Sequence, residues 1–385
     1  MKFNDVIALA LESSNETPFC LLGPPGTGKT SLGRSLAELM TARERLKNPA
    51  AAEAICIILD LSSRLPEDIG GLPNIQDGVT RYAPQSWLAT ICDPDAYGVL
   101  VLDDLPAATP AVQVAVRQLV LDRQIGEAKL SPRVKIIVTG NRREDKSAAS
   151  VLPAHFRNSV CLITVDVVLE DWANWYGEQD NLAPVVPSFL RYKNHLSKLP
   201  KDADDIGAFA TPRSWAKLGK LFDACQRTGT LLEVATGLVG AGVAREFFSF
   251  VNTRAQLIPP EQILRDPKGT VPNPRQYLDN PEKAYTAMTG IAEVAAAWFV
   301  KGGKEGKAAP GLLLVAMAHL AEGNREYAPV AVNTYAANSK NPRKAIDAFV
   351  ETYKKEFLPA TEPKHDPKIV ALMNYCIEVM TPTKK

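Results

Sequence analysis

The sequence contains little material for a metal cluster or a disulfide framework. Its 385 residues include only 4 histidines and 6 scattered cysteines, none of which form a Cys-x-x-Cys pair. Because Cys20, Cys56 and Cys161 lie inside apolar runs, we expect buried thiols in a reducing cytoplasm. No run approaches ~18 consecutive apolar residues, and the first residues lack the basic-then-apolar pattern of a signal peptide. We therefore expect no membrane span and a cytoplasmic location.

An excess of charge of one sign is also missing. The chain has 44 basic and 43 acidic residues, which gives a formal net charge of +1. This balance argues against a dedicated, non-specific nucleic-acid binder. With 46% hydrophobic and 23% charged residues the composition is that of an ordinary globular protein, and at about 150 residues per domain the length predicts two or three domains.

Short apolar runs recur through residues 1–165, and each is rich in Val, Ile and Leu without alternating polar positions. Strands that are buried on both faces have this pattern. Helical patterns separate the runs; Leu32, Leu36 and Leu39, for example, recur at helical spacing. Five such runs joined by helical crossovers predict an α/β fold with a parallel five-stranded sheet. The runs are 19–22, 54–59, 98–102, 134–139 and 160–165.

The strand pattern ends near residue 168, and the rest of the chain has a helical character. A proline-rich stretch at 258–275 has the composition of a linker or an extended wrap. Helical patterns occupy 171–176, 187–199, 214–225, 281–300, 311–321 and 342–357. We therefore predict three regions: a core at 1–167, a helical region at 168–255, and a proline-rich linker with further helices at 256–385.

A glycine-rich segment follows the first apolar run and precedes a helical segment. It matches G-x-x-x-x-G-K-[ST] with the residues Gly23, Pro24, Pro25, Gly26, Thr27, Gly28, Lys29 and Thr30. Glycines let successive backbone N–H groups turn toward phosphate oxygens at the start of a helix. In this pattern the lysine contacts the β- and γ-phosphates and the threonine hydroxyl coordinates Mg²⁺. The segment therefore predicts a site for ATP and Mg²⁺.

Polar residues end the next central strands. The run 98–102 is followed by Asp103 and Asp104, and 134–139 is followed by Gly140 and Asn141. The carboxyl ends of parallel strands are where ligands bind in open α/β sheets. We expect Asp103 to hold Mg²⁺, Asp104 to polarise the attacking water, and Asn141 to orient that water.

With these residues in place, the chain resembles the AAA+ ATPases, and within them the MoxR branch, over residues 15–225. The glycine-rich segment resembles Walker A, 99–104 resembles Walker B, and Asn141 lies where the family has its sensor 1 residue. Three further segments are similar to the insert after the second strand, its following loop, and the Walker B helix with its hairpin. They are 66–73, 81–84 and 104–126.

The resemblance also implies arginines that contact the γ-phosphate. The segment 210–215 resembles sensor 2, which implies this role for Arg213. The family also has an arginine finger, an arginine that one subunit donates to the nucleotide site of its neighbour. The resemblance assigns this role to Arg157, with Arg142 and Arg143 beside sensor 1 as alternative candidates. Such a finger is worth about 10³–10⁵ in rate in well-studied phosphoryl-transfer enzymes. The family pattern also implies a homo-oligomeric ring, usually a hexamer, with ATP between subunits.

For the whole chain, the resemblance implies a P-loop AAA+ core, an all-α lid and a helical C-terminal extension. It implies a motor that remodels or matures a protein client, with a partner that carries a von Willebrand factor A-type domain. Two features depart from the family. Walker B usually ends Asp-Glu, and here it ends Asp103-Asp104. The usual position of the arginine finger falls on Ser159, and Arg157 is the arginine close to it. The shorter side chain of Asp104 leaves open a slow ATPase or a nucleotide-dependent scaffold with little hydrolysis. A motor that acts on nucleic acid is a separate alternative, against which the lack of basic clustering counts.

Overall fold

A computed structural model describes residues 1–145, 152–199, 207–359 and 361–380. Contacts divide the chain into two units, which are described separately here. The first is built chiefly from Met1–Asp171, with Thr211–Arg213 added from later in the chain. The second consists chiefly of Trp172–Ser197 and Ser214–Lys385. The expected division into three regions remains a prediction.

The first unit is built around a five-stranded sheet in the order β2-β5-β8-β1-β9, with every neighbouring pair parallel. This confirms the expected parallel sheet, and each strand lies on one of the five apolar runs. The strands are β1 (Phe19–Leu22), β2 (Ile55–Asp60), β5 (Gly98–Asp103), β8 (Val134–Gly140) and β9 (Cys161–Thr164). Because β5, β8 and β1 lie side by side, the polar residues that follow them meet at one edge of the sheet.

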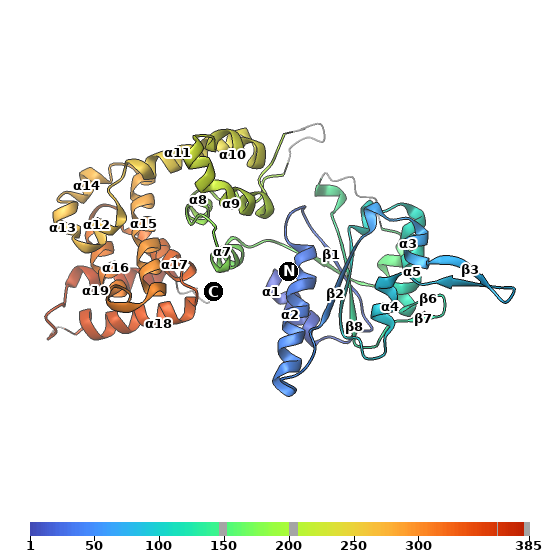
Figure 1. The fold of residues 1–385 in the computed structure, drawn as a ribbon. Helices are drawn as coiled ribbons and strands as arrows, with labels where there is room; N and C mark the ends of the chain where they lie inside the picture. Colours follow the sequence, from blue (N-terminus) through green and yellow to red (C-terminus); the bar gives the residue numbers. More distant parts are fainter. Residues whose placement is uncertain (146–151, 200–206, 360, 381–385) are drawn as a thin grey trace. The chain divides into compact units, whose positions relative to one another are not determined.

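Both faces of the sheet are covered, and β5 shows how. Val99 and Val101 pack into a core with helices α1 (Phe3–Glu12) and α2 (Lys29–Lys47). Leu100 and Leu102 pack into a second core with α5 (Pro110–Asp122) and its neighbours. Figure 1 shows α1 and α2 on one side of the strands and α3, α4 and α5 on the other. These last helices are Pro66–Gly70, Ser86–Cys92 and Pro110–Asp122. Burial on both faces explains why the strands are continuous apolar runs.

A two-stranded hairpin extends away from the first unit (Figure 1). It consists of β3 (Leu72–Gln76) and β4 (Val79–Ala83), and a shorter hairpin follows α5 at β6 (Gln124–Ile125) and β7 (Ala128–Lys129). The turn residues Asp77 and Gly78 both have positive φ, at 52° and 74°. Two-residue hairpin turns of type I′ require this conformation and favour the Asp-Gly pair.

The second unit is helical, as expected. Although α15 and α16 are 21 and 22 residues long, no helix among the described residues is long and apolar enough to cross a membrane. One large core joins α15, α16 and α17 with the helices around them. The main helices are α7 (Leu169–Glu178), α8 (Val185–Lys193), α9 (Pro212–Thr228), α10 (Leu231–Val239), α11 (Ala241–Gln256), α15 (Pro281–Lys301), α16 (Gly303–Asn324), α17 (Ala328–Ala337), α18 (Pro342–Thr352) and α19 (Pro367–Met380).

The proline-rich stretch at 258–275 is helical, so the expectation of an extended wrap was wrong. It contains three short helices, α12 (Pro260–Arg265), α13 (Pro267–Thr270) and α14 (Pro274–Tyr277). A proline in the first turn of a helix loses no hydrogen bond, and its fixed φ suits the helix. Pro260 and Pro267 occupy this position, and Asp266 caps α13 by accepting a bond from the Gly269 N–H at 3.0 Å. The prolines therefore start helices here.

Candidate nucleotide-binding site

The glycine-rich segment forms a loop between β1 and α2. Gly26 and Gly28 have φ values of 75° and 90°, in the left-handed region that side chains rarely adopt. A Cβ added to Gly26 would lie 2.8 Å from the Thr211 hydroxyl oxygen, which is closer than real contacts allow. Gly28 is also the N-cap of α2, so the loop leads directly into a helix N-terminus. This geometry directs backbone N–H groups toward an anion.

Lys29 lies against the loop that precedes it. Its Nζ donates to the carbonyl oxygens of Gly23 and Pro24 at 2.8 and 2.7 Å, and to Oδ1 of Asn141 at 3.1 Å. The predicted sensor 1 amide and the predicted phosphate-binding cation are therefore in direct contact. A γ-phosphate bound between them would contact residues from the ends of both β1 and β8.

Lys29 is buried, with 7% of its surface exposed. Burial lowers its pKa to about 8, although the carboxylates of Asp145, Asp103 and Asp104 oppose the shift. A partly desolvated ammonium interacts more strongly with an added phosphate than an exposed one does.

Asp103 and Thr30 form the part of the site that fits a metal ion. Thr30 Oγ1 donates to both carboxylate oxygens of Asp103, at 2.8 and 3.0 Å. The Thr139 hydroxyl also donates to Oδ1 of Asp103. A hydroxyl and a carboxylate are the hard oxygen donors that Mg²⁺ prefers. These two side chains therefore converge as a magnesium site requires.

Asp104 has an unusual backbone conformation, with φ 56° and ψ 40°. Its backbone N–H lies 3.3 Å from the Thr139 hydroxyl, which ties it to the strand beside it. Burial raises the pKa of its carboxyl group, and the neighbouring Asp103 raises it further, while Lys29 lowers it. A raised pKa brings a carboxylate closer to the range of a general base.

Sequence reasoning missed three polar residues of this site. Thr139 links Asp103 to the backbone of Asp104, and Asp60 lies opposite Asp103 in the β2–β5 register. Asp145 is 4% exposed, and its negative charge raises the pKa of Lys29 against the effect of burial. The signal for Asp60 was available, because it ends its strand in the same way as Asp103. The positions of Thr139 and Asp145 depend on how neighbouring segments pack.

The predicted sensor 2 residue lies at the glycine-rich loop. Arg213 belongs to the same unit as the loop, and its backbone N–H donates to the Gly26 carbonyl at 3.2 Å. A Cβ on Gly26 would lie 3.3 Å from the Arg213 Cβ. The Arg213 side chain is exposed, and its charge lowers the pKa of Lys29. Arg213 is thus placed to contact an anion held by the loop.

The three candidates for the arginine finger differ in their surroundings. Arg142 donates from Nε and Nη2 to the buried Asp145 at 2.9 and 2.8 Å, and it also pairs with Glu144. Arg157 is exposed at the end of the short helix α6 (Ala154–Arg157). The side chain of Arg143 lies outside the described residues. Of the two described candidates, Arg157 is the better placed to reach another molecule.

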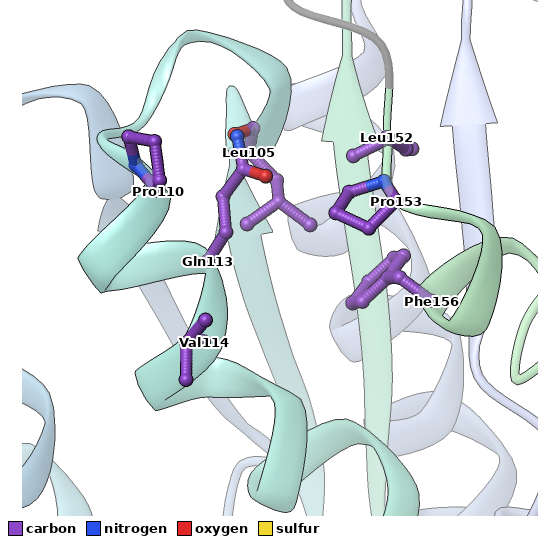
Figure 2. Close-up of a pocket in the computed structure, with 7 residues that line it drawn as sticks. All are labelled: Leu105, Pro110, Gln113, Val114, Leu152, Pro153 and Phe156. Carbon is purple, nitrogen blue, oxygen red and sulfur yellow. The ribbon is translucent and has the colours of Figure 1, made fainter.

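A small apolar pocket connects the segment after Asp104 to the segment before Arg157. Its cavity is about 90 Å³, well below the ~300–1,000 Å³ of usual ligand sites. Figure 2 shows Phe156 facing the Gln113 side chain across it. The lining residues are Leu105, Pro110, Gln113, Val114, Leu152, Pro153 and Phe156. The pocket has room for a side chain but not for a nucleotide.

Residues 18–157 match the family model of the AAA domain (dynein-related subfamily). The matched segment is a little over a third of the chain, and it contains β1, the glycine-rich loop, Asp103, Asn141 and Arg157. Over this segment the chain is therefore similar to the AAA domains of the AAA+ ATPases. A comparison with curated proteins gives no match.

Solved structures give distant similarities. A mutant RuvB from Thermotoga maritima shares 16% identity over 69% of this chain and 77% of its own, with a TM-score of 0.36. DnaA from Aquifex aeolicus with AMPPCP shares 13% identity over 98% of this chain and 93% of its own, with a TM-score of 0.34. NtrX from Brucella abortus in complex with ATP shares 12% identity over 64% of this chain and 67% of its own, with a TM-score of 0.31. At TM-scores below 0.5 these similarities carry no functional argument.

Proposed function

We propose that this protein is a MoxR-type AAA+ ATPase that couples ATP binding and hydrolysis to remodelling or maturation of a protein client. The observation that carries the proposal is the convergence at one sheet edge of Lys29, Asn141 and the Thr30–Asp103 pair. We further propose that the chain acts in a homo-oligomeric ring, usually a hexamer, with a von Willebrand factor A-type partner. These finer assignments rest on the family resemblance of the sequence.

The residues divide the reaction among them. Residues 23–28 and Lys29 hold the phosphates, and Thr30 with Asp103 would hold Mg²⁺, which offsets phosphate charge. Asp104 accepts a proton from water as the water oxygen attacks the γ-phosphorus, and the bond to the leaving ADP oxygen breaks. Asn141 orients the water, while Arg213 and a neighbour's Arg157 stabilise charge on the transferred phosphoryl group.

The test measures ATP turnover per subunit against protein concentration, with Lys29→Ala as the blank. We expect turnover that rises with concentration, because an arginine in trans acts only after assembly. Arg157→Ala should lower the rate by at least about 100-fold, since such fingers contribute about 10³–10⁵. Arg142→Ala is the comparison, because Arg142 is held by Asp145 in its own chain. A concentration-independent rate that is insensitive to Arg157→Ala would refute a finger at this position.

A nucleotide-dependent scaffold is the second candidate, and Asp104 favours it. Its carboxylate is one methylene shorter than the usual glutamate, and its backbone is fixed in the left-handed region. A displacement of about 1 Å can cost about 100-fold in rate.

We predict that Asp104→Glu raises turnover at least about tenfold, because the longer side chain returns the carboxylate toward the water. Asp104→Asn, which keeps the size and removes the base, is the matched control and should lower turnover. The measurement is phosphate release under saturating ATP and Mg²⁺. A wild-type chain that binds ATP without turnover, and that Asp104→Glu activates, is the scaffold. Equal rates for the Asn and Glu variants would show that Asp104 is not the base.

A further inference from the structure

A second cavity lies in the first unit, at the sheet edge opposite to the nucleotide site. It is lined by Tyr97, the residue before β5, and by Lys135, the second residue of β8. At the opposite ends of the same strands, Asp103 is the last residue of β5 and Asn141 follows β8. The cavity measures about 240 Å³. Its lining includes none of residues 23–30 and shares no residue with the pocket in Figure 2, so it is distinct from both sites.

The lining of this cavity is strongly basic. Four cations line it, Arg43, Lys47, Arg133 and Lys135, against a single lining carboxylate, Glu44. Glu44 is shared by Arg133 at 3.4 Å and Lys47 at 3.6 Å. Adding the nearby Glu12, which pairs with Arg43 at 3.1 Å, still leaves the cations in excess.

Lys135 is the buried cation of the cavity, with 7% of its surface exposed. Its Nζ donates to the Ser13 carbonyl at 2.7 Å, and an ammonium group has three N–H donors. Burial lowers the pKa of Lys135, the positive charges of Arg123 and Arg43 lower it further, and Glu12 opposes them. Buried like charges are unfavourable, and an anion in the cavity relieves them.

The two arginines can reach such an anion. The side chains of Arg43 and Arg133 are about half exposed, at 47% and 49%. The guanidinium of Arg133 lies over the Tyr97 ring at 4.7 Å, which helps to fix its direction. Planar guanidinium forks match phosphate oxygens with two parallel hydrogen bonds.

We propose that this cavity binds a small molecule that carries a diphosphate group. Arg43, Arg133 and Lys135 all line the cavity, so two linked phosphates can bind more of these cations at once than a single phosphate or carboxylate can. The cavity is slightly below the usual ~300–1,000 Å³ of ligand sites, which suits a compact anion rather than a nucleic-acid strand. Leu11 and Met40 add an apolar part to the lining, where the remainder of an ester can pack.

The test is calorimetric titration of inorganic diphosphate into the full chain carrying Lys29→Ala, without Mg²⁺, so that the glycine-rich loop contributes least. We expect one equivalent to bind, with an affinity that falls as salt is added. Adding Arg133→Gln should weaken binding at least tenfold, and Arg43→Gln should do the same. The matched control is Arg45→Gln, since Arg45 lies on the same helix as Arg43, pairs with Glu53 and does not line the cavity. It should change the affinity less than twofold.

Separate titrations with ADP distinguish a diphosphate ester from the free anion. If Arg133→Gln removes the binding of ADP or of inorganic diphosphate, that ligand binds in the basic cavity. Three outcomes overturn the proposal. One is the absence of binding in the Lys29→Ala chain. Another is an equal loss in the Arg45→Gln and Arg133→Gln chains. The third is tighter binding of citrate, or of a DNA duplex, than of diphosphate. Because Lys29→Ala is present throughout, failure of this test leaves the proposed ATPase function unaffected.

Discussion

At the scale of single residues, Lys29 combines a charge with a buried position. Its ammonium donates to two loop carbonyls and to the Asn141 amide, so it is held by neutral oxygens rather than by a salt bridge. Burial lowers its pKa to about 8. A bound phosphate would reverse that shift, since a nearby negative charge favours the protonated form. The protonation of Lys29 and the binding of nucleotide are therefore linked.

We predict that nucleotide binding at about pH 9 takes up nearly one proton. Above a pKa of about 8 the ligand-free lysine is mostly neutral, whereas the phosphate-bound lysine is charged. Near pH 7 the lysine is already protonated, so uptake should be close to zero. Titration calorimetry in buffers of different ionisation enthalpy measures the uptake. Lys29→Met is the control and should show none at either pH; uptake of the same size in that variant would assign the proton to another group.

At the scale of elements, α2 must approach the sheet closely for its N-terminus to meet the loop and Asp103. Gly33 permits this approach, because a Cβ there would lie 2.2 Å from the Val101 Cγ2 atom on β5. Val101 is fully buried and has no space to retreat. The interior of α10 presents the opposite case at Gly237, where a Cβ would meet nothing within 4 Å. The same residue type therefore has two different roles.

We predict opposite effects for the same substitution at these two helical positions. Gly33→Ala should lower the free energy of unfolding by about 1–3 kcal/mol, because the added methyl overpacks the helix–strand contact. Gly237→Ala should raise it by about 0.5–1 kcal/mol, because alanine loses less backbone entropy in a helix. Denaturant titration of each variant measures both changes. Stabilisation by Gly33→Ala would mean that α2 can move away from β5.

The scale of elements also shows what the sequence could and could not predict. The five strands were predictable because burial on both faces produces uninterrupted apolar runs. The helices at 260–277 were not predictable, because proline occurs in the first turn of a helix as well as in segments that have no helix. The Asp77-Gly78 pair is typical of a two-residue hairpin turn, so the β3–β4 hairpin was predictable from the sequence.

The candidate sites were likewise predictable only in part from the sequence. The loop and the residues that end the strands were predictable, because parallel strands bring their ends together. The basic cavity was not, because Arg43 and Lys47 come from α2, whereas Arg133 and Lys135 come from the start of β8, ~90 residues later. No local pattern links such distant segments; only the packing of α2 beside the sheet does. The contacts of Thr139 depend on packing in the same way.

At the scale of the whole molecule, the two units have separate hydrophobic cores. The candidate nucleotide site, including Arg213, is formed within the first unit. Of the five tryptophans, only Trp87 belongs to that unit, where its Nε1 donates to the Asp68 carbonyl at 3.2 Å. Tryptophan fluorescence can therefore report on the unfolding of one unit separately from the other.

We predict two thermal transitions, of which ATP with Mg²⁺ raises only one. A ligand at 100 times its dissociation constant adds about 2.7 kcal/mol to the unit that binds it, which corresponds to several degrees in Tm. Calorimetry follows both transitions, and Lys29→Ala should reduce the shift, because the glycine-rich loop then contributes least to binding. In a Trp87→Phe chain the remaining tryptophans all report on the second unit, so the fluorescence transition should not move with nucleotide. Transitions that shift together would show that the units unfold as one.

The β3–β4 hairpin has a consequence for how this protein can change over generations. Its side chains contribute little to either core of the first unit; Ile75 is 75% exposed and Tyr82 is 65% exposed. Substitutions at exposed positions usually change stability by less than about 0.5 kcal/mol. The hairpin can therefore acquire new side chains without weakening the sheet or displacing the residues that hold the phosphates. Evolution can therefore change the contacts that this hairpin makes while the candidate nucleotide site stays the same.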